Sequence, residues 1–327
     1  MYTEIKSFLA GDWARFQTKF LEETHSSLPQ LDKVNSYLTE HSGKQLRPML
    51  TLLIARALTG SCNENVIRCA AAVEMLHTAT LLHDDVADNS PIRRGAPTVM
   101  ALYSPTTSVL VGDFWLSRAI ETIVEYCDKR VILSFAHSLE MLAEGEMIQL
   151  EKAMDLLATE DDYAGIIYRK TAALFETAAT SAAFSVQADD DTVEACRRYS
   201  YHLGLAFQIM DDIFDYSPEL NIGKPTGQDI LEKKVTLPLF GFMKNAPCRE
   251  VEELFSRIRR VGGDVKDDFQ LTQDAVTLVQ QYKGLDYARE RLEIEIAKAR
   301  AALDVIADSK AKDYLLELAA HMSIRTR

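Results

Sequence analysis

The hydrophobic and polar positions of this chain follow the periodicity of helices. Over most of its length apolar residues recur three and four positions apart, whereas the strict alternation typical of strands is scarce. Only 14 of the 327 residues are glycine, and no segment rich in glycine, serine or proline divides the sequence. We therefore expect an all-α fold, organised as a single domain over residues 1–327.

The same periodicity places the helix boundaries. In chain order it predicts helices at about Thr3–Leu21, Leu31–Leu38, Pro48–Thr59, Asn63–Asp88, Thr107–Cys127 and Lys129–Leu150. Further helices begin after Asp161-Asp162, extend from a capping box at Asp191 and Glu194 to Asp215, and fill most of 236–327. Two of these helices end in unusual polar segments.

Both of these helices carry the same acidic motif. Residues 84–88 and 211–215 read Asp-Asp-x-x-Asp inside an apolar run, and Pro91 and Pro218 follow a few positions later. Since proline tends to end the helix that precedes it, both motifs should lie close to helix C-termini. A carboxylate there opposes the helix dipole, at a cost of about 0.3–1 kcal/mol, and the neighbouring carboxylates repel one another.

A bound divalent cation would remove this conflict. The first and third acids of each motif lie four residues apart on one face of the helix, while the second points roughly 100° away. Magnesium suits such a site because it prefers oxygen ligands, keeps several waters and is usually held by one or two carboxylates together with substrate phosphates. The alternative is a pair of solvated helix ends. The acids are Asp84, Asp85 and Asp88 in the first motif and Asp211, Asp212 and Asp215 in the second.

Cationic loops lie on either side of the first motif. The loop Gly43–Pro48 brings Lys44 and Arg47 to the start of a helix, which is a natural site for anions. Beyond the motif, Arg93 and Arg94 lie in a stiff loop between two prolines, and arginine binds phosphate through its planar fork. The alternatives are solvated charge in the first loop and, in the second, a salt bridge back to the first or third aspartate of the motif.

Other polar residues interrupt the apolar pattern. His77 lies seven residues before Asp84, two helical turns away on the same face. Lys170 and Thr171 precede an alanine-rich stretch, and a loop of glycine, proline and cations that includes Lys224 follows the second motif. These residues are candidate phosphate ligands. The competing interpretations are a satisfied core histidine for His77 and ordinary surface exposure for Lys170 and Thr171.

Composition excludes several other classes of protein. The net charge is −13 without a basic patch, so we expect no nucleic-acid binding. The five cysteines are scattered and lack metal-ligand spacing, which favours reduced thiols in a cytoplasmic protein. We also expect no secretory signal and no transmembrane segment, because no charge-free apolar run is long enough. Nucleotide-binding glycine loops and recognisable signatures of covalent catalysis are missing as well.

Taken together, the motifs resemble those of the trans-type polyprenyl diphosphate synthases, which join isoprene units head to tail. The resemblance covers nearly the whole chain, in the family's order of motifs. The motifs are Gly43–Pro48, Leu81–Asp88 followed by Arg93-Arg94, Lys170-Thr171, Gln208–Asp215, Gly223–Pro225 and Lys234 in a Lys-x-Thr-Leu-Pro run. One departure is Lys233, where the family usually has glycine, and it leaves open whether Lys233 or Lys234 contacts diphosphate.

This resemblance implies a fold and a reaction. The fold would be a helical bundle of the isoprenoid synthase type around a central cavity, usually in a homodimer, with the two acidic helix ends facing across the cavity. The reaction would be a Mg²⁺-dependent condensation of isopentenyl diphosphate with an allylic diphosphate such as farnesyl diphosphate.

The resemblance also implies a role for each candidate residue. Asp84, Asp88 and Asp211 would hold magnesium against the allylic diphosphate, with Asp85, Asp212 and Asp215 close by. That diphosphate would be bound by Arg93, Lys170, Lys224 and Lys234, with Thr171 and Gln208 beside it. Isopentenyl diphosphate would be bound without metal by Lys44, Arg47, His77 and Arg94. The six aspartates, Lys170 and Lys234 are thus the predicted catalytic residues.

Side chains ahead of the first motif bear on product length. Farnesyl-length members of the family tend to place aromatic side chains about one turn before it, where this chain has Ala79 and Thr80. Small residues there would let the product extend past Leu76, with Phe114 or Trp115 as a deeper floor. We therefore predict a long product of the kind used for quinone side chains, with a geranylgeranyl-length product as the alternative.

Two rival functions have discriminating features. A class I terpene cyclase would also ionise an allylic diphosphate, but two Asp-Asp-x-x-Asp motifs and a separate cationic site for isopentenyl diphosphate argue against it. A non-catalytic partner subunit of a prenyl synthase would typically have lost acids from one motif, and both motifs are intact here.

Overall fold

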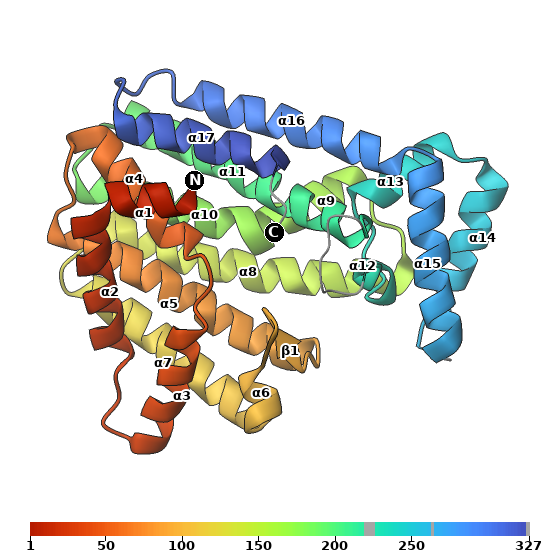
Figure 1. The fold of residues 1–327 in the computed structure, drawn as a ribbon, viewed down its shortest axis with the longest axis horizontal. Coiled ribbons are helices and arrows are strands. Elements are labelled where there is room, and N and C mark those ends of the chain that lie inside the picture. The colour runs from red at the N-terminus through yellow and green to blue at the C-terminus, as the bar shows by residue number, and fades with distance from the viewer. Residues whose placement is uncertain (219–225, 263–264, 325–327) are drawn as a thin grey trace. The chain divides into compact units, whose positions relative to one another are not determined.

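The computed structural model describes residues 1–218, 226–262 and 265–324, and it is built almost entirely of helices (Figure 1). The chain forms two compact units of three segments each. Unit 1 comprises Met1–His137, Leu174–Arg197 and Leu303–Leu315, and unit 2 comprises Ser138–Ala173, Arg198–Ala302 and Leu316–Arg327. The all-α prediction is confirmed, whereas the single domain over residues 1–327 stays a prediction.

The elements follow one another with short connections. The first group is α1 (Tyr2–Phe8), α2 (Ala10–Thr24), α3 (Pro29–Glu40), α4 (Leu46–Thr59), α5 (Glu64–Ala87), β1 (Ile92–Arg93), β2 (Ala96–Pro97), α6 (Val99–Leu102), α7 (Pro105–Val124) and α8 (Lys129–Asp155). The second group is α9 (Glu160–Ile167), the π-helix η1 (Tyr168–Ala172), α10 (Ala173–Ser185), α11 (Asp190–Asp215), α12 (Gln228–Leu231), α13 (Leu237–Asn245), α14 (Cys248–Ile258), α15 (Val265–Gln281), α16 (Gly284–Ala302) and α17 (Lys310–Ile324). None of the described helices combines the length and the hydropathy needed to cross a membrane.

Helix α5 is the central element of unit 1, and it packs along α7 and against α4 and α2 (Figure 1). Its sequence explains this position, because nearly every residue from Val66 to Leu76 is buried, and a helix that is apolar all round must be enclosed. Asn63 caps the helix by accepting a hydrogen bond from the backbone N–H of Val66 at 3.0 Å. Asp88 is the C-cap, so the predicted helix Asn63–Asp88 is confirmed and the first acidic motif lies at its carboxyl end.

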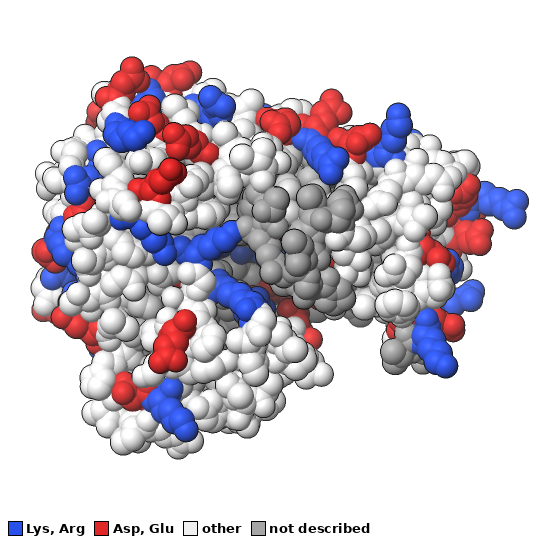
Figure 2. All heavy atoms as spheres, in the orientation of Figure 1, with Lys and Arg blue, Asp and Glu red and all other residues white. Residues whose placement is uncertain are grey.

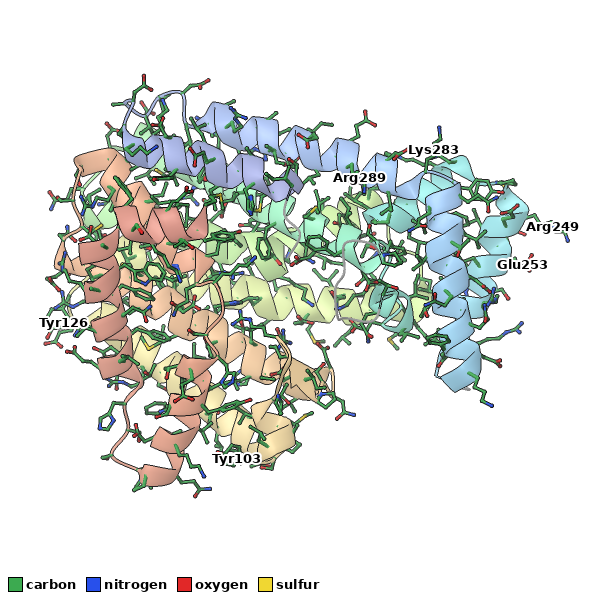
Figure 3. The ribbon with its side chains drawn as sticks, in the orientation of Figure 1. Tyr103, Tyr126, Arg249, Glu253, Lys283 and Arg289 are labelled. Carbon is green, nitrogen blue, oxygen red and sulfur yellow. The ribbon has the colours of Figure 1, made fainter. Side chains whose placement is uncertain are left out.

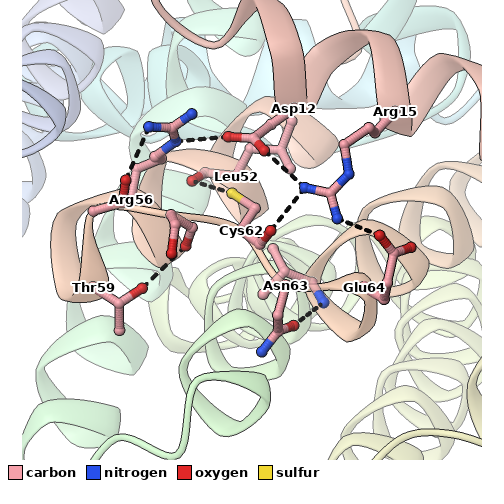
Figure 4. A network of polar contacts seen from close by, with 11 residues as sticks. Asp12, Arg15, Leu52, Arg56, Thr59, Cys62, Asn63 and Glu64 are labelled. Atoms are coloured by element: carbon pink, nitrogen blue, oxygen red, sulfur yellow. Dashed lines mark hydrogen bonds and ion pairs between the residues drawn. The ribbon is translucent and has the colours of Figure 1, made fainter.

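An ion-pair network joins α2 and α4 to the start of α5 (Figure 4). The carboxylate of Asp12 is 5% exposed and accepts hydrogen bonds from Arg56 Nε at 2.6 Å and Arg15 Nη1 at 3.1 Å. Arg15 also donates to the carbonyl oxygen of Cys62 at 2.8 Å and pairs with Glu64 in the first turn of α5. The buried carboxylate of Asp12 therefore links α2 and α4, the two helices that this network joins to the start of α5.

In unit 2, α13 packs against α16 and α15, and α14 lies against both α13 and α15. The faces of α14 divide sharply by polarity. Leu254, Phe255 and Ile258 are buried, whereas Arg249 and Glu253 are exposed and point away from the protein (Figure 3). This division follows the amphipathic pattern from which the helix is recognised in the sequence.

The approach of α11 to η1 depends on a glycine. A Cβ atom at Gly204 would lie 2.5 Å from the Cα atom of Ala172, closer than any real side chain is found. Only glycine allows these backbones to approach so closely. The contact sets the helix that carries the second acidic motif beside the π-helix that carries Lys170 and Thr171.

Three local predictions need correction. The helix predicted at Thr3–Leu21 is divided at Leu9 into α1 and α2, and the break lets both Ile5 and Phe16 be buried. The loop after the first motif pairs as the antiparallel strands β1 and β2. The capping box predicted at Asp191 is wrong, because Asp189 Oδ1 accepts the hydrogen bond, from the backbone N–H of Thr192 at 2.8 Å.

We predict that Asp12→Ala lowers the free energy of unfolding by about 2–3 kcal/mol, because two arginines lose a buried, hydrogen-bonded partner. The midpoint of urea unfolding would measure the loss. Asp308→Ala is the matched control, since the Asp308 side chain is 99% exposed even though its carboxylate pairs with Lys312 at 3.0 Å. The control should change stability by less than about 1 kcal/mol. Equal effects of the two changes would contradict the prediction.

Candidate active site

The first acidic motif contains one buried carboxylate and two more accessible ones. Asp85 is 4% exposed, and its Oδ1 accepts a hydrogen bond from Arg93 Nε at 2.6 Å. Asp84 is half-buried and Asp88 is exposed. Burial raises the pKa of the Asp85 carboxyl, and the guanidinium of Arg93 opposes this rise. The salt bridge considered for Arg93 therefore does form, and its partner is the second aspartate of the motif.

The second motif repeats this arrangement. Asp212 is 5% exposed and accepts hydrogen bonds from the Tyr163 hydroxyl at 2.6 Å and from Gln208 Nε2 at 2.9 Å. Burial is the main cause that raises the pKa of Asp212 to about 7, and these two hydrogen bonds oppose it. Asp211, the first acid of the motif, is half-buried, as Asp84 is in the first motif.

Asp215 ties the end of α11 to α12. Its two carboxylate oxygens accept hydrogen bonds from the backbone N–H groups of Gln228 at 3.0 Å and Asp229 at 2.9 Å. Asp229 is itself enclosed, and burial raises its pKa well above the usual value. Among the described residues its Oδ2 has no hydrogen-bond partner. The sequence-based prediction did not include Asp229, although a single acid at the start of a short helix was a signal for it.

The arrangement fits a divalent metal without being a complete cage for one. The donors are carboxylate oxygens, which suit a hard cation, and the second acid of each motif is occupied by protein partners. Asp84, Asp88 and Asp211, the metal ligands predicted from the sequence, are half-buried or exposed, and their role as ligands stays a prediction. Within residues 1–218, 226–262 and 265–324, no group of three or more acids, histidines or cysteines is arranged to bind a metal. Magnesium commonly needs only one or two carboxylates, with water and phosphate oxygens completing its shell.

The π-helix η1 brings two predicted phosphate ligands beside α11. Lys170 Nζ lies 2.5 Å from Glu146 Oε1 on α8. Thr171 Oγ1 donates to Gln208 Oε1 at 2.8 Å, and Gln208 in turn donates to Asp212. Such π-helical turns occur frequently at functional sites. The structure therefore places Thr171 and Gln208 together with the second motif.

The backbone distinguishes the two lysines that follow α12. Lys233 has a φ of 56°, in the left-handed region that favours glycine, which explains why the family usually has glycine here. Its Nζ lies 3.4 Å from the carbonyl oxygen of Arg259. Lys234 pairs with Glu232, and its charge partly offsets the effect of burial on the pKa of Asp212. Lys234 is thus the lysine beside the second motif.

Lys224, also predicted to bind the allylic diphosphate, lies outside the described residues.

The cations predicted to bind isopentenyl diphosphate come together in unit 1. Arg47 is 8% exposed and lies over the ring of Phe175, 4.6 Å from its centre. Lys44 Nζ lies 4.9 Å from the centre of the Tyr2 ring. Loss of hydration lowers the pKa of His77 well below its usual value, and the charge of Arg47 lowers it further. On the face shown in Figure 2, Lys and Arg side chains gather between α1 and the β1–β2 hairpin.

Arg94 is held against the first cationic loop. A Cβ atom at Gly43 would lie 2.6 Å from Arg94 Nη1, so the guanidinium occupies the space that any other residue at position 43 would fill. Gly43 also has a φ of 69°, which few other residues tolerate. Burial lowers the pKa of Arg94. The glycine of the Gly43–Pro48 motif therefore positions an arginine that lies 51 residues further along the chain.

Two charged residues of this region were missed by the sequence-based prediction. Glu74 is 2% exposed and lies on α5 one turn before His77. Burial lowers the pKa of Lys6, on α1, and the negative charge of Glu74 opposes this change, so the two residues lie close together. Glu74 could have been recognised from the sequence, because it is the one charged residue in the run from Cys69 to Leu76. No sequence pattern singles out Lys6.

The residues predicted to set product length differ in their surroundings. Ala79 is 1% exposed, whereas Thr80 is half-buried and donates a hydrogen bond to the carbonyl oxygen of His77 at 2.8 Å. Trp115 is fixed in the core of unit 1, because its Nε1 donates to Asn35 Oδ1 at 2.8 Å. Thr80 is therefore the better position at which to alter the space beside the first motif.

An all-α fold in which two helices each end in an Asp-Asp-x-x-Asp motif is typical of an isoprenoid synthase, and comparisons with known proteins agree. The chain matches the polyprenyl synthetase family over residues 28–272. It is 35% identical to an octaprenyl diphosphate synthase from Haemophilus influenzae, over 97% of this chain and 94% of that protein. The chain therefore belongs to the polyprenyl synthetase family, and it is a trans-prenyltransferase of the isoprenoid synthase fold.

Solved structures give the same result. A decaprenyl diphosphate synthase from Rhodobacter capsulatus is 35% identical, with a TM-score of 0.92 and complete coverage of both chains, 100% in each case. A polyprenyl synthase from Caulobacter crescentus, solved in complex with calcium and isoprenyl diphosphate, is 34% identical with a TM-score of 0.91, covering 100% of this chain and 98% of that one.

We predict opposite results for the two neighbouring lysines. Lys234→Ala should lower prenyltransferase kcat by about 100-fold or more, because a cation beside the second motif is lost. Lys233→Gly should leave kcat within about 2-fold and change the free energy of unfolding by 0 to about +1 kcal/mol, because relief of the left-handed strain is partly offset by the entropy of glycine. Steady-state kinetics and urea unfolding would measure both. A loss of activity only in the Lys233 variant would reverse the assignment.

Proposed function

We propose that this chain is a Mg²⁺-dependent synthase that adds isopentenyl diphosphate units to an allylic diphosphate such as farnesyl diphosphate and releases a long-chain all-trans polyprenyl diphosphate. The observation that carries the proposal is the common pattern of the two acidic motifs, each at a helix end and each with its own cations. The relatives that make octaprenyl and decaprenyl diphosphate support a long product. Calcium and isoprenyl diphosphate in a relative support a divalent metal at a diphosphate.

The residues at the acidic motifs would bind and activate the allylic substrate. Asp84, Asp88 and Asp211 would hold the metal, which when bound neutralises charge on the leaving diphosphate. Arg93, Lys170, Lys224 and Lys234 would bind diphosphate oxygens, with Thr171 and Gln208 orienting that group. Their charges stabilise the negative charge that develops as the C–O bond breaks. Asp85, Asp212 and Asp215 would keep the helix ends in place through their protein partners.

The cations of unit 1 would bind the second substrate. Lys44, Arg47, His77 and Arg94 would hold the diphosphate of isopentenyl diphosphate, so that its double bond is positioned to attack the allylic cation. The cation formed by this attack then loses a proton to give the product, and the departing diphosphate would accept that proton. The apolar side chains of α5 would keep water from the cation.

Two further properties belong to the proposal. The two units would act as one polyprenyl synthase domain, and the product would have the length used for quinone side chains. We also propose a homodimer, because Met147, Leu150 and Met154 of α8 are 67%, 59% and 82% exposed at helical spacing on one face. Sedimentation of the purified chain would test this, and a monomer at micromolar concentration would exclude it.

Product analysis tests the proposed function. The purified chain, farnesyl diphosphate, labelled isopentenyl diphosphate and magnesium should yield a polyprenyl diphosphate longer than geranylgeranyl diphosphate on chromatography. Removal of magnesium with a chelator should abolish turnover, and added magnesium should restore it. If the geranylgeranyl-length product were the only one formed, the long-chain claim would be contradicted. Cyclisation without isopentenyl diphosphate would indicate a terpene cyclase, and inactivity of the chain alone would indicate a partner subunit.

We predict that Thr80→Phe shortens the product, because an aromatic ring at the half-buried position one turn before the first motif would block the growing chain. The mean product length on the same chromatograms should fall, with kcat for the first addition reduced less than about 10-fold. Thr59→Phe is the control, since Thr59 ends α4 well away from the motif on the chain. Unchanged product length in Thr80→Phe would show that the chain does not pass this residue.

A further inference from the structure

One buried acid lies among the cations of unit 1 and has no role in the reaction described above. Glu74 of α5 is 2% exposed, and within the described residues its Oε2 atom has no hydrogen-bond partner. Three cations act on its charge, namely Lys6 of α1, Arg47 of α4 and Arg94 of the β1–β2 turn. A buried carboxylate is costly unless the charges around it compensate. The position of Glu74 therefore links it to the residues proposed to bind isopentenyl diphosphate.

We propose that Glu74 is the internal counter-ion of the isopentenyl diphosphate subsite: in the free protein its carboxylate balances the charges of Arg47 and Arg94, and the diphosphate of the substrate displaces it. The inference rests on the proposed function, because it takes these arginines as ligands of isopentenyl diphosphate. It adds an internal anion with which the substrate must compete.

The surroundings of the two arginines support this role. The guanidinium of Arg47 lies over Phe175 and that of Arg94 is held against Gly43, so each is fixed on one side by packing. Like charges in a buried region repel one another, and the negative charge of Glu74 offsets this repulsion in the free protein. Its Oε2 atom makes no hydrogen bond to any described residue, so a substrate anion can replace the carboxylate as the counter-ion.

Displacement of the carboxylate has a consequence for protons. Burial raises the pKa of Glu74 to about 7, and Arg47, Arg94 and Lys6 limit this rise. A diphosphate that engages the same cations adds negative charge and raises the pKa of Glu74 further. Above about pH 7, binding of the substrate is therefore coupled to uptake of a proton, and binding weakens as the pH rises. His77 faces the same arginines and is the other group that could take up the proton.

Two measurements test the proposal with isopentenyl diphosphate as the probe, without metal or allylic substrate in the first. Calorimetric titration in buffers of different ionisation enthalpy gives the number of protons taken up on binding, at about pH 6 and about pH 8. Steady-state kinetics with farnesyl diphosphate and magnesium give kcat and the KM of each substrate over the same range. The variants are Glu74→Gln, which keeps the shape and removes the charge, Glu74→Asp, which keeps the charge, and His77→Gln.

The native protein should take up a substantial fraction of a proton at about pH 8 and much less at about pH 6, where Glu74 already carries one. Glu74→Gln should abolish this uptake and lower the KM of isopentenyl diphosphate at about pH 8 by roughly 10-fold, a change of about 1.4 kcal/mol. At about pH 6 its KM should approach that of the native protein. The KM of farnesyl diphosphate should stay unchanged, and Glu74→Asp should retain the pH dependence.

Several results would overturn the proposal. One is an unchanged or higher KM for isopentenyl diphosphate in Glu74→Gln at about pH 8, and another is a KM that changes by the same factor at both pH values. A third is proton uptake that survives in Glu74→Gln but is lost in His77→Gln. Absence of proton uptake in the native protein would also overturn the proposal, even if the variants failed to fold. Binding of isopentenyl diphosphate without uptake refutes only this inference, whereas no binding and no elongation by the native protein refute the proposed function.

Glu295→Gln is the matched control. Glu295 is a glutamate that is 8% exposed in unit 2, where it accepts hydrogen bonds from His202 at 2.6 Å and from Lys298 at 2.8 Å. This variant also removes a buried negative charge from cationic partners, but at a place not assigned to either substrate. It should leave proton uptake and both KM values at those of the native protein.

Discussion

A carboxylate enclosed by an apolar helix has to be stabilised by a hydrogen bond or a cation, and this constraint underlies the arrangement of both units. Glu74 and Asp85 are buried on α5, and Asp212 is buried on α11. Leaving any of them uncompensated would cost several kcal/mol, of the order of half the stability of a typical domain. Arg93, Arg94 and Lys234 lie close enough to these acids for their charges to oppose the effect of burial on the pKa of the carboxyl groups.

The acids within each motif differ in their burial and in their protein partners. The second aspartate fixes the helix end: Asp85 binds the hairpin through Arg93, and Asp212 binds α9 through Tyr163. The first aspartate of each motif is half-buried. The third differs between motifs, because Asp215 anchors α12 through two backbone N–H groups while Asp88 is exposed. Equivalent sequence positions therefore do not guarantee equivalent roles.

Helix periodicity and proline positions sufficed to predict the long helices and the placement of both motifs at helix ends. The spacing of the aspartates also separated the second acid from the other two. What the sequence could not supply were partners set by tertiary packing. Tyr163 precedes Asp212 by 49 positions, and no local pattern connects them. Arg94 and Gly43 are similarly far apart in the sequence. The division of the first predicted helix at Leu9 can be understood only once the buried partners of α1 and α2 are known. Glu74 stands out in the sequence as an isolated charge, but the sequence does not show that Lys6 and Arg47 lie near it.

The loops that carry the cations also hold strained backbone. In the described part of the chain, seven residues other than glycine have positive φ, and four of them, Gln45, Asn89, Arg94 and Lys233, lie in the loops that bear the predicted phosphate ligands. Each such residue costs on the order of 1–3 kcal/mol and persists only where the surrounding structure fixes it. A left-handed residue turns the chain sharply, which lets a short loop direct a cation back toward the helix before it, as the hairpin with its turn at Arg94 does for Arg93 and Asp85. Regular helices cannot do this, since their side chains point outward and toward the N-terminus. The long, well-packed helices therefore supply the stability, and part of it offsets the strain of the loops that carry these cations.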